Sequence, residues 1–263
     1  GFDKYLDSLI SIIGLAQEDD GYIYTYRQIM GDNSHPWIGS ERWELVHDLS
    51  HELFNLGFLI EAGVAHYEAT GKTNLLDISI KAADCIDNAF GWGKIEDYPG
   101  HEAVEFALVK LYRATGEQKY LDLAKFFLDV RGPNGEEYNQ AHLKVTDQTE
   151  AVGHAVRATY LYTGMADVAA ITNDYSYVDA IDKIWEDIIY RKIYVTGGIG
   201  ATGGNEGFDM PYALPNASAY CETCASIGNI MFNHRMFMLH GESKYLDVAE
   251  RSLYNSFLSG ISL

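Results

Sequence analysis

Apolar residues recur along most of the chain at helical spacing, and the predicted helices come in pairs. The first helix of each pair is almost wholly apolar, and the second is amphipathic. The apolar helices are expected over His51–Thr70, His101–Thr115, Asp147–Thr163 and Ser218–His240. The amphipathic helices are expected over Leu75–Phe90, Tyr120–Arg131, Tyr177–Arg191 and Tyr245–Ser259. One further helix, Phe2–Gln17, precedes the pairs.

A short segment recurs between the two helices of each pair. Its four copies begin at Gly71, Gly116, Asn173 and Gly241, and each has an aspartate six residues later, at Asp77, Asp122, Asp179 and Asp247. Glycine and asparagine readily adopt the left-handed conformation that ends a helix. The repeat therefore predicts helix hairpins in which the apolar helix packs inward and the amphipathic helix covers it.

Helix hairpins stack either into an open superhelix or into a closed (α/α)6 toroid. The four repeat aspartates are 45, 57 and 68 residues apart, which is less regular than most superhelical repeats. The spacing thus favours an all-α fold of the toroid, or barrel, type. Four pairs and one extra helix are too few to close six pairs, so residues 1–263 are expected to form part of a barrel domain in a longer protein.

Three segments without helical periodicity lead into the apolar helices, at residues 18–43, 91–100 and 194–216. We expect these segments to gather with the N-terminal ends of the apolar helices at one face of the barrel. Titratable residues recur at those helix ends: His51, His101, His154, Cys221, Glu222 and Cys224. A histidine at such a position is often only a cap, but several at one end of a scaffold favour a ligand site.

The stretch from Tyr194 to Cys224 is the richest in chemistry. It carries two carboxylates, Glu206 and Glu222, and two thiols, Cys221 and Cys224. Carboxylate and thiolate groups are zinc ligands, and a second carboxylate nearby is a candidate general acid or base. The spacing alone leaves alternatives open, because buried cysteines are commonly inert, a loop glutamate is commonly only solvated, and a structural zinc site needs four ligands.

Gly198, Gly200 and Gly203 fit the pattern G-x-G-x-x-G, which occurs in dinucleotide-binding proteins. That use requires a strand before the glycines and a helix directly after them. Here the glycines run into Asn-Glu-Gly-Phe among predicted helices. The pattern therefore indicates a flexible crossover loop, or a loop whose backbone approaches a ligand closely, rather than a nucleotide site.

The composition limits the partners. A net charge of −19 argues against nucleic acid and anionic membrane surfaces as ligands, since both attract basic patches. No apolar run reaches the length of a membrane span. The three cysteines form no disulfide framework, and Cys85 lies in an amphipathic helix. Oligomeric state stays open, as does the choice between the cytoplasm and the periplasm of a bacterium.

Several long motifs resemble glycoside hydrolase family 127, the β-L-arabinofuranosidases. They include HELFNLGFLIEAGVAHYEATGK, PGHEAVEFALVKLYRATGEQKYLDLAKFFLDVRG, QTEAVGHAVRATYLYTGMADVA, YVTGGIGATGGNEGF and YCETCASIGNIMFNHRMF. The resemblance runs from Leu6 to Leu263. It implies an (α/α)6 catalytic barrel followed by β-sandwich domains, so the remaining barrel helices and the sandwich domains are expected outside these 263 residues.

The resemblance also implies roles for individual residues. Glu206 matches the general acid/base, and Glu222 and Cys224 match two ligands of a zinc ion. Two adjacent cysteines beyond residue 263 are implied to complete the zinc site, one of them being the nucleophile. Histidines matching those that line the sugar pocket are His51, His101 and His154. Phe58 departs from the family, whose members often have histidine there, and Cys221 matches no ligand.

The sequence thus predicts a retaining glycoside hydrolase acting on β-L-arabinofuranosides or related sugars, with a glycoside or oligosaccharide as its substrate. Residues 1–263 alone are expected to be inactive, because the implied nucleophile is not among them. Two other functions stay open: a non-catalytic helical carbohydrate-binding or interaction scaffold, and a sugar epimerase that uses histidines without a metal. Stoichiometric zinc in the intact protein would favour the hydrolase.

Overall fold

A computed structural model describes residues 1–133 and 135–262, except for the side chain of Asp32. The chain divides into two compact units, Gly1–Phe127 and Leu128–Leu263. In the part of the chain that is described, helices are joined by loops and turns, and β-pairing is limited to isolated bridges. The prediction of an all-α fold is confirmed, whereas closure into a toroid stays a prediction.

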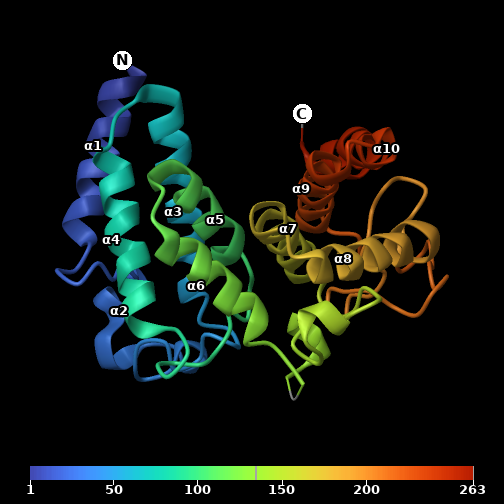
Figure 1. Cartoon of the computed structure of the whole chain (residues 1–263), viewed down its shortest axis with the longest axis horizontal. Helices are drawn as coiled ribbons and strands as arrows, with labels where there is room; N and C mark the ends of the chain where they lie inside the picture. Colours follow the sequence, from blue (N-terminus) through green and yellow to red (C-terminus); the bar gives the residue numbers. More distant parts are fainter. Residues whose placement is uncertain (134, 263) are drawn as a thin grey trace. The chain divides into compact units, whose positions relative to one another are not determined.

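The first unit contains five helices and most of a sixth in its described residues. They are α1 (Phe2–Ala16), α2 (Thr25–Met30), α3 (Glu52–Thr70), α4 (Asn74–Ala89), α5 (Val104–Thr115) and α6 (Gln118–Asp129), whose last residues belong to the second unit. Helix α3 packs against both α4 and α5, and α1 packs against α4 (Figure 1). The apolar helix α3 therefore lies between the amphipathic helix of its own pair and the apolar helix of the next.

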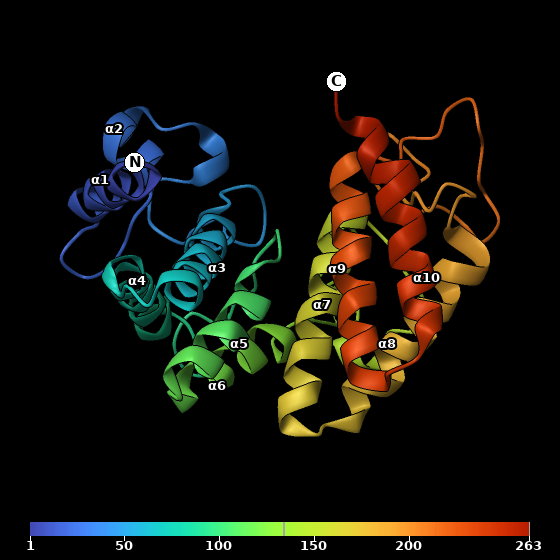
Figure 2. The same ribbon diagram turned by 90° about the horizontal axis from the view of Figure 1, so that it is seen from above.

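The second unit contains α7 (Ala155–Thr172), α8 (Tyr175–Asp187), α9 (Thr223–His240) and α10 (Ser243–Arg251). Helix α9 lies beside both α7 and α10 (Figure 2). Two of these helices continue into π-helical turns, α8 into Ile188–Lys192 and α10 into Ser252–Phe257. Such turns are rare and are often found near functional sites.

The predicted helix hairpins are present, and their turns have the predicted chemistry. Helices α3, α5, α7 and α9 each end at a residue in the left-handed conformation: Gly71 (φ 72°), Gly116 (φ 76°), Asn173 (φ 55°) and Gly241 (φ 72°). The next helix starts within three residues of the cap in every case. The sequence repeat therefore encodes the helix stop itself.

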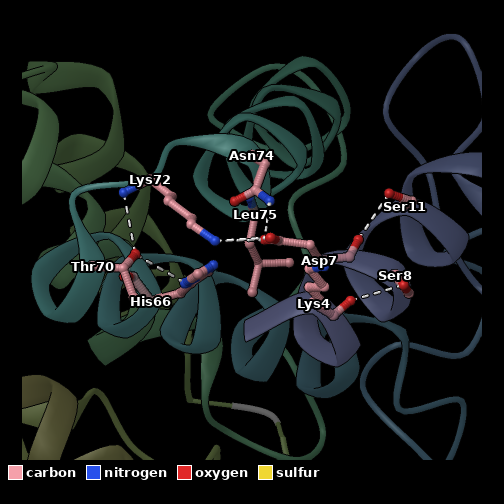
Figure 3. A network of polar contacts seen from close by, with 9 residues as sticks. All are labelled: Lys4, Asp7, Ser8, Ser11, His66, Thr70, Lys72, Asn74 and Leu75. Atoms are coloured by element: carbon pink, nitrogen blue, oxygen red, sulfur yellow. Dashed lines mark hydrogen bonds and ion pairs between the residues drawn. The ribbon is translucent and has the colours of Figure 1, made fainter. Parts of the chain in front are cut away.

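Side chains also fasten the first of these turns. Lys72 lies just after the Gly71 cap, and its Nζ forms an ion pair with Asp7 of α1 at 2.8 Å (Figure 3). Asn74 donates to the same carboxylate at 3.4 Å. The pair is exposed to solvent and so contributes little to stability. Its position shows how α1 is joined to the α3–α4 hairpin.

Burial separates the two helix types as predicted. Every residue of α7 from Ala155 to Ala169 is buried, whereas α8 buries one face that includes Tyr177, Ile181 and Trp185. These spacings of about four residues are those of an amphipathic helix. In the second unit, the apolar helix α7 is thus covered by the amphipathic helix α8.

Several predicted boundaries were wrong. Helix α7 begins at Ala155 rather than Asp147, because Gly153 adopts a left-handed φ of 70° where a Cβ would lie 2.0 Å from the Glu137 carbonyl oxygen. It continues beyond Thr163 to Thr172. Helix α5 begins at Val104 rather than His101. The segment 18–43, predicted to lack helix, contains α2 and two short 3₁₀ turns.

Candidate active site

The loop that carries Glu206, residues 200–208, closes on itself. Thr202 and Gly207 exchange two backbone hydrogen bonds of 3.1 Å, and the Thr202 hydroxyl donates to Asn205 Oδ1. Glu206 has a left-handed φ of 52°, which is uncommon for a residue with a side chain. We call residues 200–208 the Glu206 loop. This closure fixes the position of the Glu206 backbone, from which the side chain extends.

Backbone hydrogen bonds attach the Glu206 loop to the segment before α7. The Ala155 N–H donates to the Glu206 carbonyl at 3.1 Å, and the Phe208 N–H donates to the Gly153 carbonyl at 2.9 Å. Gly207 must be glycine here, since a Cβ on it would lie 2.1 Å from the Gly153 oxygen. This pairing places Glu206 beside His154, the N-cap residue of α7.

The same loop is also attached to the segment before α9. The Cys221 N–H donates to the Gly200 carbonyl at 2.8 Å, and the Tyr220 N–H donates to the Ala201 carbonyl at 3.3 Å. Glu222, the N-cap residue of α9, follows directly. The Glu206 loop therefore joins the starts of α7 and α9, as expected from the predicted gathering of loops and helix starts within this unit.

His154 is buried and holds the Glu206 carboxylate. Its Nε2 lies 3.0 Å from Glu206 Oε2, while its Nδ1 accepts the backbone N–H groups of Val156 at 3.2 Å and Arg157 at 3.4 Å. Because Nδ1 acts as an acceptor, the neutral ring must carry its proton on Nε2, which then donates to Glu206. The helix start thus sets both the tautomer and the direction of the histidine.

Glu206, Glu222 and His154 converge on one point. Their ligand atoms all lie within 4.8 Å of one another, an arrangement that could hold a metal ion. The Tyr220 hydroxyl lies near both carboxylates. Its interaction with Glu206, with burial and the charge of Glu222, raises the pKa of Tyr220 to about 12, so its hydroxyl remains protonated at neutral pH.

Cys224 lies in the first turn of α9, near the Glu222 carboxylate. Burial, and then the neighbouring Glu222, raise the pKa of the Cys224 thiol, and burial raises the pKa of Glu222. A bound divalent cation reverses this balance, because it favours the ionised form of both groups. Glu222 and Cys224 offer the carboxylate and thiol groups that zinc accepts, but the three ligand atoms that lie within 4.8 Å of one another belong to His154, Glu206 and Glu222 and do not include Cys224.

The first unit brings the other two predicted histidines together. His51, the N-cap residue of α3, and His101 before α5 have ring centroids 5.6 Å apart. Phe54 packs edge-on against His101 at 4.4 Å, and Phe58 packs against Phe54 at 4.9 Å. His51 Nδ1 bonds to the Leu49 carbonyl at 2.6 Å. Phe58 thus extends an aromatic wall beside this histidine pair.

Comparison with known proteins identifies the family. The model of the β-L-arabinofuranosidase GH127 catalytic domain matches residues 1–263. The chain is 40% identical over 282 residues to a non-reducing end β-L-arabinofuranosidase from Bifidobacterium longum subsp. longum, covering 98% of this chain and 42% of that protein. The chain belongs to the GH127 β-L-arabinofuranosidase family.

Solved structures agree with this assignment. A GH127 β-arabinofuranosidase superposes with a TM-score of 0.96 at 58% identity, over 98% of this chain and 42% of its own. A GH127 β-L-arabinofuranosidase from Geobacillus stearothermophilus T6 gives 0.91 at 41% identity, over 99% and 43%. The GH127 chain thus spans about two fifths of the relatives that it matches.

Other residues of the GH127 chain lie apart from this site or only border it. Cys85 is buried in α4, where burial raises the pKa of its thiol to about 11. Cys221 lies beside Gly198, and burial raises its thiol pKa as well. The Gly198–Gly203 stretch runs into the Glu206 loop rather than into a helix. None of the described helices is both long and apolar enough to cross a membrane.

Tyr220 is the site residue that the sequence reasoning missed. Its place two residues before Glu222 was a usable signal, because a residue that near a helix start can reach the same carboxylates. Aromatic residues are so numerous in this chain that none stood out by type, with 19 tyrosines in all. Its role becomes visible only through the backbone bond that sets it against the Glu206 loop.

Proposed function

We propose that the protein to which this GH127 chain belongs is a retaining glycoside hydrolase that releases β-L-arabinofuranose from the non-reducing end of its substrates. The observation that carries this proposal is the joining of the Glu206 loop to the starts of α7 and α9, which sets Glu206 against His154 and Glu222. The sugar and the site of cleavage are taken from the names of relatives in the same family.

Glu206 is assigned the general acid/base role. In a retaining mechanism this group first protonates the departing oxygen and then takes a proton from the incoming water. The His154 Nε2–H bonds to one carboxylate oxygen, which supports an orientation that leaves the other oxygen for the substrate. The Glu206 side chain is 45% exposed, so a sugar can reach it.

Glu222 and Cys224 are assigned as zinc ligands. His154 is a poor third ligand, because Nδ1 accepts backbone N–H groups and Nε2 donates to Glu206, so neither nitrogen offers a lone pair to an ion. When bound, zinc would keep a coordinated thiol deprotonated and therefore nucleophilic. The nucleophilic cysteine itself is proposed to lie in the protein outside residues 1–263.

His51, His101 and His154 are assigned to the sugar pocket. Imidazole groups can donate to or accept from sugar hydroxyls, and the Phe54 ring beside His101 offers an apolar surface to a sugar face. The pair His51–His101 and the residue His154 come from equivalent places in successive helix hairpins. His51 and His101 are proposed to contact the sugar, whereas His154, whose two ring nitrogens are both engaged, is proposed to hold Glu206 beside it.

The test is Glu206→Gln in the full-length protein. Removing the acid/base should lower kcat/KM for a β-L-arabinofuranoside by about 10²–10⁴-fold without changing zinc content. Glu250→Gln, on an exposed position of α10, is the matched control and should keep parental activity. Activity of Glu206→Gln within about tenfold of the parent would contradict the assignment. Binding of arabinofuranosides without hydrolysis by the parent would indicate a scaffold.

A further inference from the structure

A pocket with two exposed tyrosines lies at the C-terminal end of α8, within the second unit. Its volume is about 450 Å³, and it is lined by Thr149, by residues between Lys183 and Arg191, and by Tyr212. We call it the α8 pocket. Pockets that bind small organic ligands have volumes of roughly 300–1,000 Å³, so this one is large enough for such a ligand. None of its lining residues is assigned to the candidate active site.

The π-helical turn Ile188–Lys192 determines which side chains reach this pocket. Residues five apart align along a π-helix, so Lys192 turns inward, where its Nζ pairs with the buried Asp187 at 2.9 Å. Tyr190 and Arg191, which come just before Lys192, are exposed and line the pocket. The turn therefore buries one basic residue and leaves an aromatic ring and a guanidinium group at the surface.

Both tyrosines of the α8 pocket are held in place although they are exposed. The Tyr190 ring packs edge-on against the buried Trp185 ring, with centroids 6.2 Å apart. The Tyr212 backbone N–H donates to the Arg191 carbonyl at 2.8 Å, and Tyr212 has a left-handed φ of 66°, which is uncommon for a residue with a bulky side chain. Tyr190 is nevertheless 65% exposed and Tyr212 is 72% exposed. Single apolar residues at a surface are ordinary, but two aromatic residues fixed beside one pocket indicate a contact surface.

The polar lining offers donors and acceptors that the protein itself leaves unused. Within the described part of the chain, no ion pair or side-chain hydrogen bond engages Lys183 or Glu186. The Arg191 Nη1 lies 3.6 Å from Asp187 Oδ1, which orients the guanidinium group without a hydrogen bond. The two cations and the two carboxylates of the lining add to no net charge. The pocket therefore selects for neither an anion nor a cation.

This combination of groups indicates the class of ligand. Hydroxyl groups both donate and accept, so a neutral carbohydrate can bond to the Glu186 carboxylate and to the Arg191 guanidinium at the same time. The flat apolar faces of the tyrosine rings suit the C–H face of a sugar ring. An apolar ligand would instead cover the charged groups and leave them without partners. A carbohydrate is thus the ligand that uses the whole lining.

We propose that the α8 pocket is a second carbohydrate-binding site, which holds a polysaccharide chain without cleaving it. The carbohydrate class follows from the lining of the pocket, whereas the choice of an arabinofuranose polymer rests on the proposed function. A polymer held at a second site stays near the protein between catalytic encounters, which raises the effective concentration of its chain ends. The site therefore serves retention on a polymer rather than the chemical step.

The test is affinity electrophoresis of the full-length protein in native gels that contain soluble arabinan, a neutral polymer of L-arabinofuranose. The parent should migrate more slowly than in a gel without polysaccharide. The double variant Tyr190→Ala/Tyr212→Ala should bind arabinan about tenfold more weakly, because both aromatic surfaces are lost. Its kcat/KM toward methyl β-L-arabinofuranoside should change less than about twofold, because neither tyrosine belongs to the candidate active site.

A second variant tests the polar lining separately. Arg191→Gln removes the guanidinium group and keeps the backbone carbonyl that fixes Tyr212, so it should weaken arabinan binding by about threefold. Tyr175→Ala is the matched control, because Tyr175 is an exposed tyrosine of α8 that does not line the pocket. It should be retarded like the parent. Thermal unfolding verifies that each variant is folded.

The outcomes separate this site from the proposed function. If arabinan does not retard the parent, or retards the double variant equally, the second site is wrong, while hydrolysis of the methyl glycoside would still support the proposed function. Equal losses of arabinan binding and of kcat/KM also overturn the second site, because the tyrosines would then act on the site of Glu206. If the parent binds arabinan through the tyrosines but hydrolyses no arabinofuranoside, the second site stands and the proposed function fails.

Discussion

Each unit has a pair of helix starts that carry polar side chains, those of α3 and α5 in the first and those of α7 and α9 in the second. The two pairs differ in which side chains they bring together. The first pair sets His51 and His101 among phenyl rings. The second sets His154 with two carboxylates, a tyrosine hydroxyl and a thiol. Both use an N-cap position to place a histidine.

The difference comes from the segment that crosses between helix pairs. The crossover after α8 contains the Glu206 loop, which folds back and bonds to both helix starts. Repeated hairpins thus supply a frame, and an inserted loop supplies the acidic chemistry. We expect changes in the second unit to alter the rate of reaction and changes in the first unit to alter sugar binding.

The largest effect is expected from Cys224→Ser. A serine hydroxyl is a much weaker zinc ligand than a thiolate, so bound zinc should fall well below one ion per chain. Hydrolysis should fall by on the order of 10³-fold, because the proposed nucleophile would no longer be activated. Metal analysis by mass spectrometry and kcat/KM are the two measurements, made on the full-length protein.

Cys221→Ser is the matched control, because it changes the same residue type three positions earlier. Cys221 faces Gly198, and the sequence resemblance gives it no ligand role. Zinc content and activity should both stay near parental values. Loss of zinc in Cys221→Ser, or full retention in Cys224→Ser, would show that the ligands are assigned wrongly.

Gly207→Ala tests whether the backbone pairing between the Glu206 loop and Gly153 positions the Glu206 carboxylate. The new methyl group would lie 2.1 Å from the Gly153 carbonyl, so the Glu206 loop must move away from α7. A displacement of about 1 Å at a catalytic group can cost about 10²-fold in rate. We therefore expect kcat/KM to fall by about that factor while the melting temperature drops modestly.

Gly204→Ala, in the same loop, is the control, since a Cβ there meets nothing within 4 Å. It should retain activity. If Gly207→Ala keeps the parental rate, the pairing with Gly153 does not position Glu206. The Glu206 loop would then not explain the difference between the two units.

Turn residues show which parts of the fold could be predicted from the sequence and which could not. The turns at Gly71, Gly116, Asn173 and Gly241 were predictable, because a left-handed helix cap is a local preference of the residue itself. The late start of α7 was not, because it depends on contacts with another segment: Gly153 lies close to the Glu137 carbonyl, and the His154 N–H donates to the Tyr138 carbonyl. Local propensity carries no information about such a contact.

The candidate site was likewise predictable only in part from the sequence. Glu206, Glu222 and Cys224 were singled out by residue type, spacing and family resemblance. Their partners were not all foreseen, since the bond from His154 and the approach of Tyr220 arise only when the Glu206 loop meets two helix starts. The pocket lined by Tyr138, Val152 and Lys192 was not foreseen either, because its residues come from four separate segments.

Histidine replacements compare the two units directly. His154→Gln should lower kcat by about 10–10²-fold, because it disturbs the contact that holds Glu206. His101→Gln should mainly raise KM, since His101 is proposed to contact the sugar. Steady-state kinetics with one arabinofuranoside measure both. Equal effects on kcat would contradict separate roles for the two units.

Tyr220→Phe should give the smallest effect. The variant keeps the ring and removes only the hydroxyl that interacts with Glu206 and Glu222. A full hydrogen bond to a buried charged group is worth about 1.5–3 kcal/mol, and this interaction is worth less because Glu206 is half exposed. We expect kcat/KM to fall about threefold to tenfold, with zinc content unchanged.

A matched control makes this last prediction specific. Tyr212→Phe, on an exposed position of the same crossover segment, should leave kcat/KM unchanged. Unchanged kcat/KM in Tyr220→Phe would mean that the tyrosine does not act on the acid/base, and that the two carboxylates are positioned by the backbone bonds of the Glu206 loop alone.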